Sequence, residues 1–148
     1  MNIKLASGVA VVVAAGGFFL AAVHAQAPSR SVWDGVYTEG QADRGRTVYE
    51  ERCALCHGQS LEGVEMAPAL IGGQFLNTWN GQSVGDLYER MRTTMPVDDP
   101  GSLSRAANAD VMAFLLRANK FPSGKVELPR QNIVLNQILI EAKKRDQE

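Results

Sequence analysis

The pattern of hydrophobic and polar positions predicts an all-α protein of short helices joined by long turns. The first helix begins at Thr38, because Thr38 and Gln41 have the spacing of a capping box. A glycine within a helix costs up to about 1 kcal/mol relative to alanine, so we expect another element to approach Gly45 closely. The apolar stripe of this helix consists of Ala42, Gly45, Tyr49 and Cys53.

Two more helices are predicted by the same signals. One begins after Ser83, which has the capping-box spacing to Asp86, and ends before Met95-Pro96, since the residue before proline is disfavoured in a helix. The other begins after Ser104 and ends before residues 121–124. Their apolar stripes are Val84, Leu87, Tyr88 and Met91 in one, and Ala107, Val111, Phe114, Leu115 and Ala118 in the other.

Three segments lack a sustained period. We expect an irregular lead-in over residues 26–37 and mainly a loop over residues 58–80, which are rich in Gly, Pro, Asn and Gln. The tail, residues 125–148, is ambiguous between a helix and an extended strip. The helical face would hold Ile133, Val134, Ile138, Leu139 and Ala142, and the strip would hold Ile138, Ile140 and Ala142.

The N-terminal stretch predicts a targeting segment. Lys4 is the only charge before Arg30, and residues 5–23 are almost wholly apolar. Small residues at Val23 and Ala25 have the spacing that a signal peptidase reads, so we expect residues 1–25 to be removed after export to the periplasm. The alternative is an uncleaved membrane anchor, because the run is nearly long enough to span a bilayer. Residues 38–124 would then form the folded domain.

The composition of the chain excludes some classes of protein. The chain has 148 residues with 15 Lys+Arg and 16 Asp+Glu, which fits one domain of near-neutral charge. It lacks the basic bias of a nucleic-acid-binding protein. Two cysteines, Cys53 and Cys56, cannot form a framework of several disulfides.

The candidate chemistry lies in Cys53-Ala54-Leu55-Cys56-His57, the C-x-x-C-H attachment pattern of c-type haem. On one helical turn, both thiols can add to the haem vinyl groups while His57 presents its imidazole to the iron. Three other interpretations remain. A structural zinc site would need a fourth ligand, a dithiol oxidoreductase would need a surrounding βαβ unit, and a disulfide across this short separation would stabilise little.

A methionine thioether is the usual second axial ligand. Met91 and Met112 lie on apolar helical stripes, and Met66 follows His57 by only nine positions. Met95 precedes a proline 38 residues after His57, which lets the chain reach the other face of the haem. We therefore expect His57 and Met95 to be the axial ligands of the iron.

These motifs occur in order with several others. Residues 38–124 thereby resemble a small class I cytochrome c with His/Met ligation, in which short helices wrap around one covalently bound haem c. More narrowly, they are similar to the soluble monohaem cytochromes found alongside quinoprotein alcohol dehydrogenases. The matching pieces include Gly45 and Tyr49, Ala67-Pro68 with Leu70 and Gly72, Phe75 and Trp79, Thr94-Met95-Pro96, Gly101 with Leu103-Ser104, and Phe114 with Asn119.

The resemblance implies roles for single residues. Pro68 matches the proline whose carbonyl accepts a hydrogen bond from the axial histidine; the alternative is an ordinary loop proline. Gly45 matches the glycine where the first helix crosses the last, with Phe114 as its opposite contact. Trp79 is either a hydrogen-bond donor to a haem propionate or a core residue.

The resemblance also implies a function. We expect an electron-transfer protein rather than an enzyme, with no catalytic residues, carrying one electron at a time from a periplasmic dehydrogenase to a terminal oxidase or another cytochrome of a respiratory chain. Membrane contact is expected only if the N-terminus is retained. Two alternatives stay open. One is a haem enzyme or ligand sensor with an open sixth site, and the other is a tightly bound haem subunit of a dehydrogenase complex, with the tail as its strap.

Overall fold

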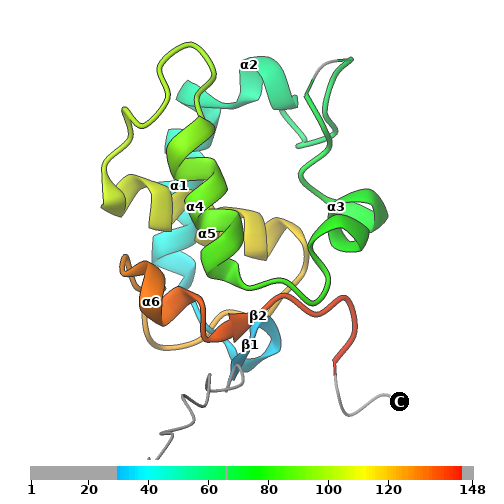
Figure 1. Ribbon diagram of the computed structural model, residues 1–148, viewed down its shortest axis with the longest axis vertical. Coiled ribbons are helices and arrows are strands. Elements are labelled where there is room, and N and C mark those ends of the chain that lie inside the picture. The colour runs from blue at the N-terminus through cyan, green and yellow to red at the C-terminus, as the bar shows by residue number, and fades with distance from the viewer. Residues whose placement is uncertain (1–29, 66, 145–148) are drawn as a thin grey trace, which may run out of the picture.

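The computed structural model describes residues 30–65 and 67–144, and there it confirms the predicted all-α fold (Figure 1). The expected signal peptide and Met66 lie outside the described residues. The helices are the 3-10 turn η1 (Val32–Asp34), α1 (Glu39–Arg52), α2 (Ala54–His57), α3 (Gly72–Trp79), α4 (Val84–Thr94), α5 (Arg105–Ala118) and α6 (Asn132–Leu135), and two short strands, β1 (Arg30–Ser31) and β2 (Ile138–Leu139), pair in parallel. None of these helices is both long and apolar enough to cross a membrane.

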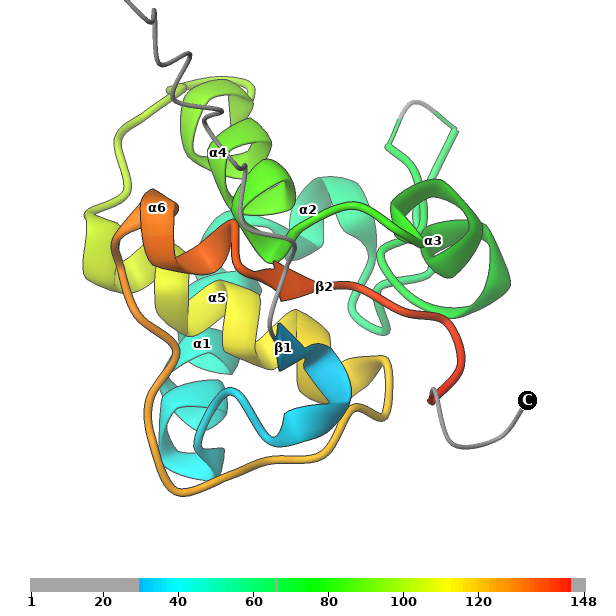
Figure 2. The same ribbon diagram turned by 60° about the horizontal axis from the view of Figure 1, so that its bottom comes forward.

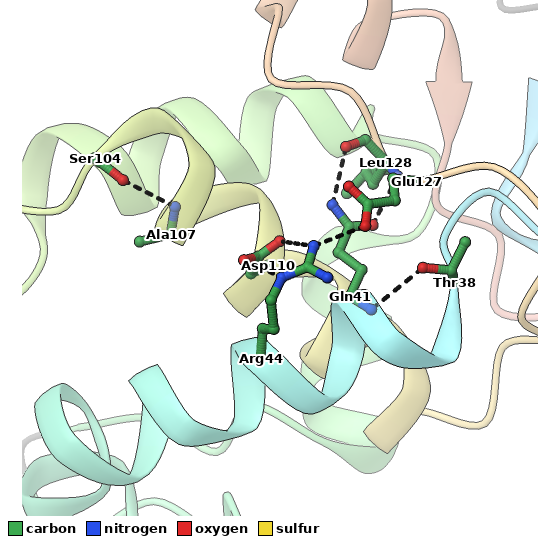
Figure 3. A network of polar contacts seen from close by, with 8 residues as sticks. All are labelled: Thr38, Gln41, Arg44, Ser104, Ala107, Asp110, Glu127 and Leu128. Atoms are coloured by element: carbon green, nitrogen blue, oxygen red, sulfur yellow. Dashed lines mark hydrogen bonds and ion pairs between the residues drawn. The ribbon is translucent and has the colours of Figure 1, made fainter.

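The predicted helix starts are confirmed. The Thr38 hydroxyl accepts the N–H of Gln41, and the Ser104 hydroxyl accepts the N–H of Ala107 (Figure 3). Ser83 and Asp86 form the complete capping box, in which each side chain accepts the other residue's N–H. These bonds use backbone N–H groups that have no partner within the helix.

The Thr38 capping box is only half formed. The Gln41 side chain turns away from the helix start and pairs with the backbone of Leu128, donating to its carbonyl at 3.0 Å and accepting its N–H at 2.7 Å (Figure 3). The second half of the predicted box is therefore wrong, because a buried backbone segment of the tail competes for this amide.

Helices α1 and α5 make the main helix crossing (Figures 1 and 2). A Cβ atom on Gly45 would overlap the Asp110 carbonyl group, so the expected close approach is present. We expected Phe114 to be the partner of Gly45. The partner is instead the backbone of Asp110. The Phe114 ring lies about one turn further along α5, with its centroid 5.2 Å from that of Tyr49.

The prediction of mainly a loop over residues 58–80 holds for the described residues up to 71, but it missed one helix. The second half of this segment forms α3, which begins at Gly72 with a φ of 75° and buries Phe75 in the core. Leu76 and Trp79 follow at positions that face the same way and pack against the large core cluster. Tertiary packing of this short apolar face outweighs the glycine-rich start of the helix.

The lead-in is more regular than we expected. Ser31 and Asp34 form a capping box around the 3-10 turn, and Val32, Val36 and Tyr37 are buried. The prediction of an irregular lead-in is therefore wrong for residues 30–37, the part that the structure describes. These residues lack a repeating period because they form one turn only, and their apolar side chains enter the core individually.

The tail resolves into an extended strip after one helical turn. Ile138 and Ile140 are buried on alternate positions, which confirms the extended alternative for this stretch. Ile133 is 76% exposed and Val134 is 39% exposed, so the single helical face is wrong. Figure 2 shows the tail passing through α6 and β2 to lie beside β1.

Candidate haem site

The two cysteines frame a single helical turn. Cys53 closes α1 by donating its N–H to the Tyr49 carbonyl, and the N–H of His57 then returns to the Cys53 carbonyl at 2.9 Å. Cys53 is half-buried, Cys56 is exposed, and both thiols are free. Burial raises the pKa of the Cys53 thiol to about 11. Dithiol oxidoreductases instead lower the pKa of their reactive cysteine, so this environment does not support that alternative.

The His57 ring is buried and has one defined partner. Its Nδ1 lies 2.9 Å from the carbonyl oxygen of Pro68. Because a carbonyl oxygen only accepts, the hydrogen of the neutral ring is on Nδ1, and Nε2 carries the lone pair that a metal requires. This is the contact that the resemblance implies for Pro68, and it fixes both the tautomer and the orientation of the ring.

The loop after His57 folds back over it. The His57 carbonyl accepts the N–H of Gly63 at 2.8 Å, and the N–H of Leu70 donates to the Leu61 carbonyl at 2.9 Å. The Tyr49 hydroxyl donates to the Gly58 carbonyl at 2.7 Å. The sequence placed Tyr49 on an apolar stripe and among the pieces that match the cytochromes, without a role for its hydroxyl. The hydroxyl on a stripe residue was the available signal for this second role.

The other candidate methionines and Trp79 fall into distinct environments. Met95 is the extended, half-buried C-cap residue of α4, and its turn lies at the same end of the molecule as α2 (Figure 1). Met112 is completely buried in the core, and Met91 is half-buried. Trp79 is half-buried against the large core cluster, and within the described residues its indole N–H has no hydrogen-bond partner.

The comparisons with known proteins agree with this geometry. Residues 40–115 match the family described as cytochrome C oxidase, cbb3-type, subunit III. The chain belongs to this cytochrome c family. No curated protein matches the chain. A solved structure of the sulfane dehydrogenase SoxCD from Paracoccus pantotrophus is similar, with a TM-score of 0.51 and 21% identity over 78% of this chain and 68% of that one. At this identity the likeness shows the fold alone.

Family membership implies haem c, and the residues of this cytochrome fit it. Two free thiols and a histidine with an available Nε2 lie on one turn. Among the described residues, no group of three or more His, Cys, Asp or Glu is placed to hold a metal ion, so the zinc alternative finds no further ligand there. Apolar side chains that are only half-buried pack against the two core clusters, and they include Cys53, Leu70, Ile71, Leu76, Trp79 and Met91.

Proposed function

We propose that this cytochrome is a one-electron carrier whose haem iron is held by His57 and Met95. The observation that supports this best is the contact between His57 Nδ1 and the Pro68 carbonyl, which leaves Nε2 as a fixed ligand. When bound, haem c supplies a reversible Fe(III)/Fe(II) couple. Cys53 and Cys56 would keep it attached, and a Met95 thioether would raise its potential.

The proposed carrier exchanges electrons with other redox proteins. Leu55 on α2 is 95% exposed, and Val97, two residues after Met95, is 73% exposed. Both belong to segments at the same end of the molecule (Figure 1). Exposed apolar side chains beside a redox site suit the small, short-lived interfaces of electron-transfer partners. From the resemblance, we propose a quinoprotein or other dehydrogenase as donor, with a terminal oxidase or another cytochrome as acceptor.

The proposed location is the periplasm or another compartment outside the cytoplasm. Its support is the basic, apolar and small-residue pattern of residues 1–25, together with the haem attachment motif. Retention of this segment would convert the carrier into one that is anchored at the membrane.

The packing of the tail does not favour the alternative of a tightly bound dehydrogenase subunit with the tail as its strap. Four apolar side chains of the tail are buried inside this chain, since Leu128, Leu135, Ile138 and Ile140 are each at most 2% exposed. A haem enzyme or sensor remains the main rival, and it differs from a carrier in having an open sixth site on the iron.

The ligand set is tested by the weak far-red band that reports a sulfur ligand of ferric haem. We expect this band in the haem-loaded protein and in a Met91→Leu control, which changes a half-buried methionine one turn earlier. Met95→Ala should lose the band and become high-spin. Its potential should fall by more than about 0.1 V, because axial ligands tune haem potentials over about 0.8 V.

Two outcomes would contradict the proposal. A band that survives in Met95→Ala would assign the sulfur to another methionine, with Met66 tested next. A native protein that is high-spin and lacks the band would have an open site, which is the property of the enzyme or sensor.

A further inference from the structure

The C-terminus of α5 carries a buried amide with three partners. Asn119 is 8% exposed. Its Oδ1 accepts the N–H of Gly72 at 3.1 Å, and its Nδ2 donates to the carbonyls of Leu70 and Leu115, both at 2.9 Å. One side chain thus connects the last long helix to the backbone on both sides of Ile71.

This backbone is continuous with the partner of the axial histidine. Leu70 is two residues after Pro68, whose carbonyl faces His57 Nδ1. The N–H of Leu70 donates to the Leu61 carbonyl, and earlier in the loop Ala67 and Val64 exchange backbone hydrogen bonds. The position of the Pro68 carbonyl therefore depends on a short stretch that is fixed at Ala67 on one side and at Leu70 on the other.

The end of α5, from which Asn119 projects, is closed by backbone hydrogen bonds. The N–H of Asn119 donates to the Leu115 carbonyl at 3.1 Å, and the N–H of Phe121 donates to the Leu116 carbonyl at 3.1 Å. Lys120 takes the left-handed conformation, with a φ of 68°, that closes many helix ends. Leu115 and Leu116 are buried in the core, so Asn119 projects from a well-packed helix end.

The three backbone groups that Asn119 binds require a side-chain amide at this position. A carbonyl at Leu70 and an N–H at Gly72 must be satisfied by one side chain that both donates and accepts. Aspartate would keep the acceptor for Gly72 but would face the carbonyls of Leu70 and Leu115 without a donor. Alanine would leave all three backbone groups without this partner.

We propose that Asn119 is the positioning residue for the axial histidine, holding the Leu70–Gly72 backbone so that the Pro68 carbonyl stays in hydrogen-bond contact with His57 Nδ1. The inference rests on the proposed ligation of the iron by His57. A well-placed acceptor at Nδ1–H makes the imidazole a stronger donor to the metal. This favours the ferric state, so a loosened contact should raise the reduction potential.

The test compares Asn119→Ala and Asn119→Asp with the parent, all haem-loaded. The first measurement is exchange of the His57 Nδ1 hydrogen with water, followed by NMR, and the second is the reduction potential. We expect exchange to become faster by about tenfold in both variants, as for loss of one buried hydrogen bond, and the potential to rise in Asn119→Ala. Asn119→Asp keeps the size of the side chain, so the comparison survives if the alanine variant does not fold.

Gln41→Ala is the matched control, because Gln41 is also a buried amide that bonds both backbone groups of a distant segment. It should lower stability while leaving Nδ1–H exchange and the potential unchanged. Equal exchange in the parent and both Asn119 variants would overturn the proposal and leave Asn119 a structural residue. If the parent itself lacks the shifted ring signals of an iron-bound His57, the ligand assignment fails, and the inference fails with it for that separate reason.

Discussion

At the scale of single residues, the crossing of α1 and α5 depends on the absence of a side chain at Gly45. Gly45 allows the Asp110 carbonyl to lie where a side chain would begin. Arg44, its neighbour, then reaches both Asp110 and Glu127 with bonds of 3.0 and 2.8 Å (Figure 3). The Arg44 side chain is half-exposed and its pair with Asp110 is bidentate, so both this ion pair and the close backbone contact join the two helices at this crossing.

A methyl group at this crossing should be costly. Gly45→Ala is expected to lower the free energy of unfolding by about 1–3 kcal/mol, because two backbones must separate to accommodate it. Gly40→Ala is the control in the same helix, since a Cβ there meets nothing within 4 Å. That change should be neutral or stabilising by up to about 1 kcal/mol. Denaturant unfolding of the haem-loaded variants measures both, and equal effects would contradict this account.

At the scale of elements, the tail completes the core that the helices leave open. Leu128 is joined to α1 through Gln41, and Asn136 lies within hydrogen-bond distance of Ser83 at the start of α4. Strand β2 pairs with β1, so the tail also holds the lead-in in place. Helices α1 and α4 and strand β1 therefore share one closing segment.

Two isoleucines of the tail have the same side chain but opposite burial, so their variants measure what burial contributes to stability. Ile138 is 1% exposed and Ile133 is 76% exposed. We expect Ile138→Ala to lower the free energy of unfolding by about 2–5 kcal/mol through the lost burial and the cavity it leaves. Ile133→Ala should change it by less than about 0.5 kcal/mol. Similar losses for both variants, measured in denaturant, would show that the tail does not pack as described.

At the scale of the whole molecule, the three tyrosines each connect their helix or turn to the backbone of another segment. Each is at most 1% exposed, and each hydroxyl donates to a backbone carbonyl: Tyr37 to Phe121, Tyr49 to Gly58 and Tyr88 to Arg105. Burial raises the pKa of all three, for Tyr37 to about 12, with nearby Glu39 adding to the effect there. A phenolate could not donate to these carbonyls.

This arrangement predicts loss of stability in alkali. The pKa of Tyr37 is higher in the folded chain than its ordinary value of 10.0, so the folded state binds more protons above that pH. The free energy of unfolding should be unaffected by this group below pH 10 and should fall as the pH approaches about 12. Unfolding curves at stepped pH measure the slope, and Tyr37→Phe should reduce it. An unchanged slope in that variant would assign the loss to other groups.

Features that depend on neighbouring residues were predictable. Thr38, Ser83 and Ser104 act within one turn of the chain, and Met95-Pro96 ends α4 by a local steric effect. Helix α3 was missed because its composition favours a turn and its stability comes from Phe75 in the core. Asn119 was matched only as part of the family pattern, since its partners are 47 and 49 residues away.

The sequence by itself determined the all-α class, the helix starts and the Cys53–His57 motif, because spacing along a few residues is enough to specify them. It also indicated a cytochrome c, and residues 40–115 match a cytochrome family. Only the tertiary structure decided that Asp110 lies against Gly45, that the tail closes the core as an extended strip, and that Asn119 supports the loop beside His57. These contacts join segments far apart in the chain, and their geometry exists only once the core is packed.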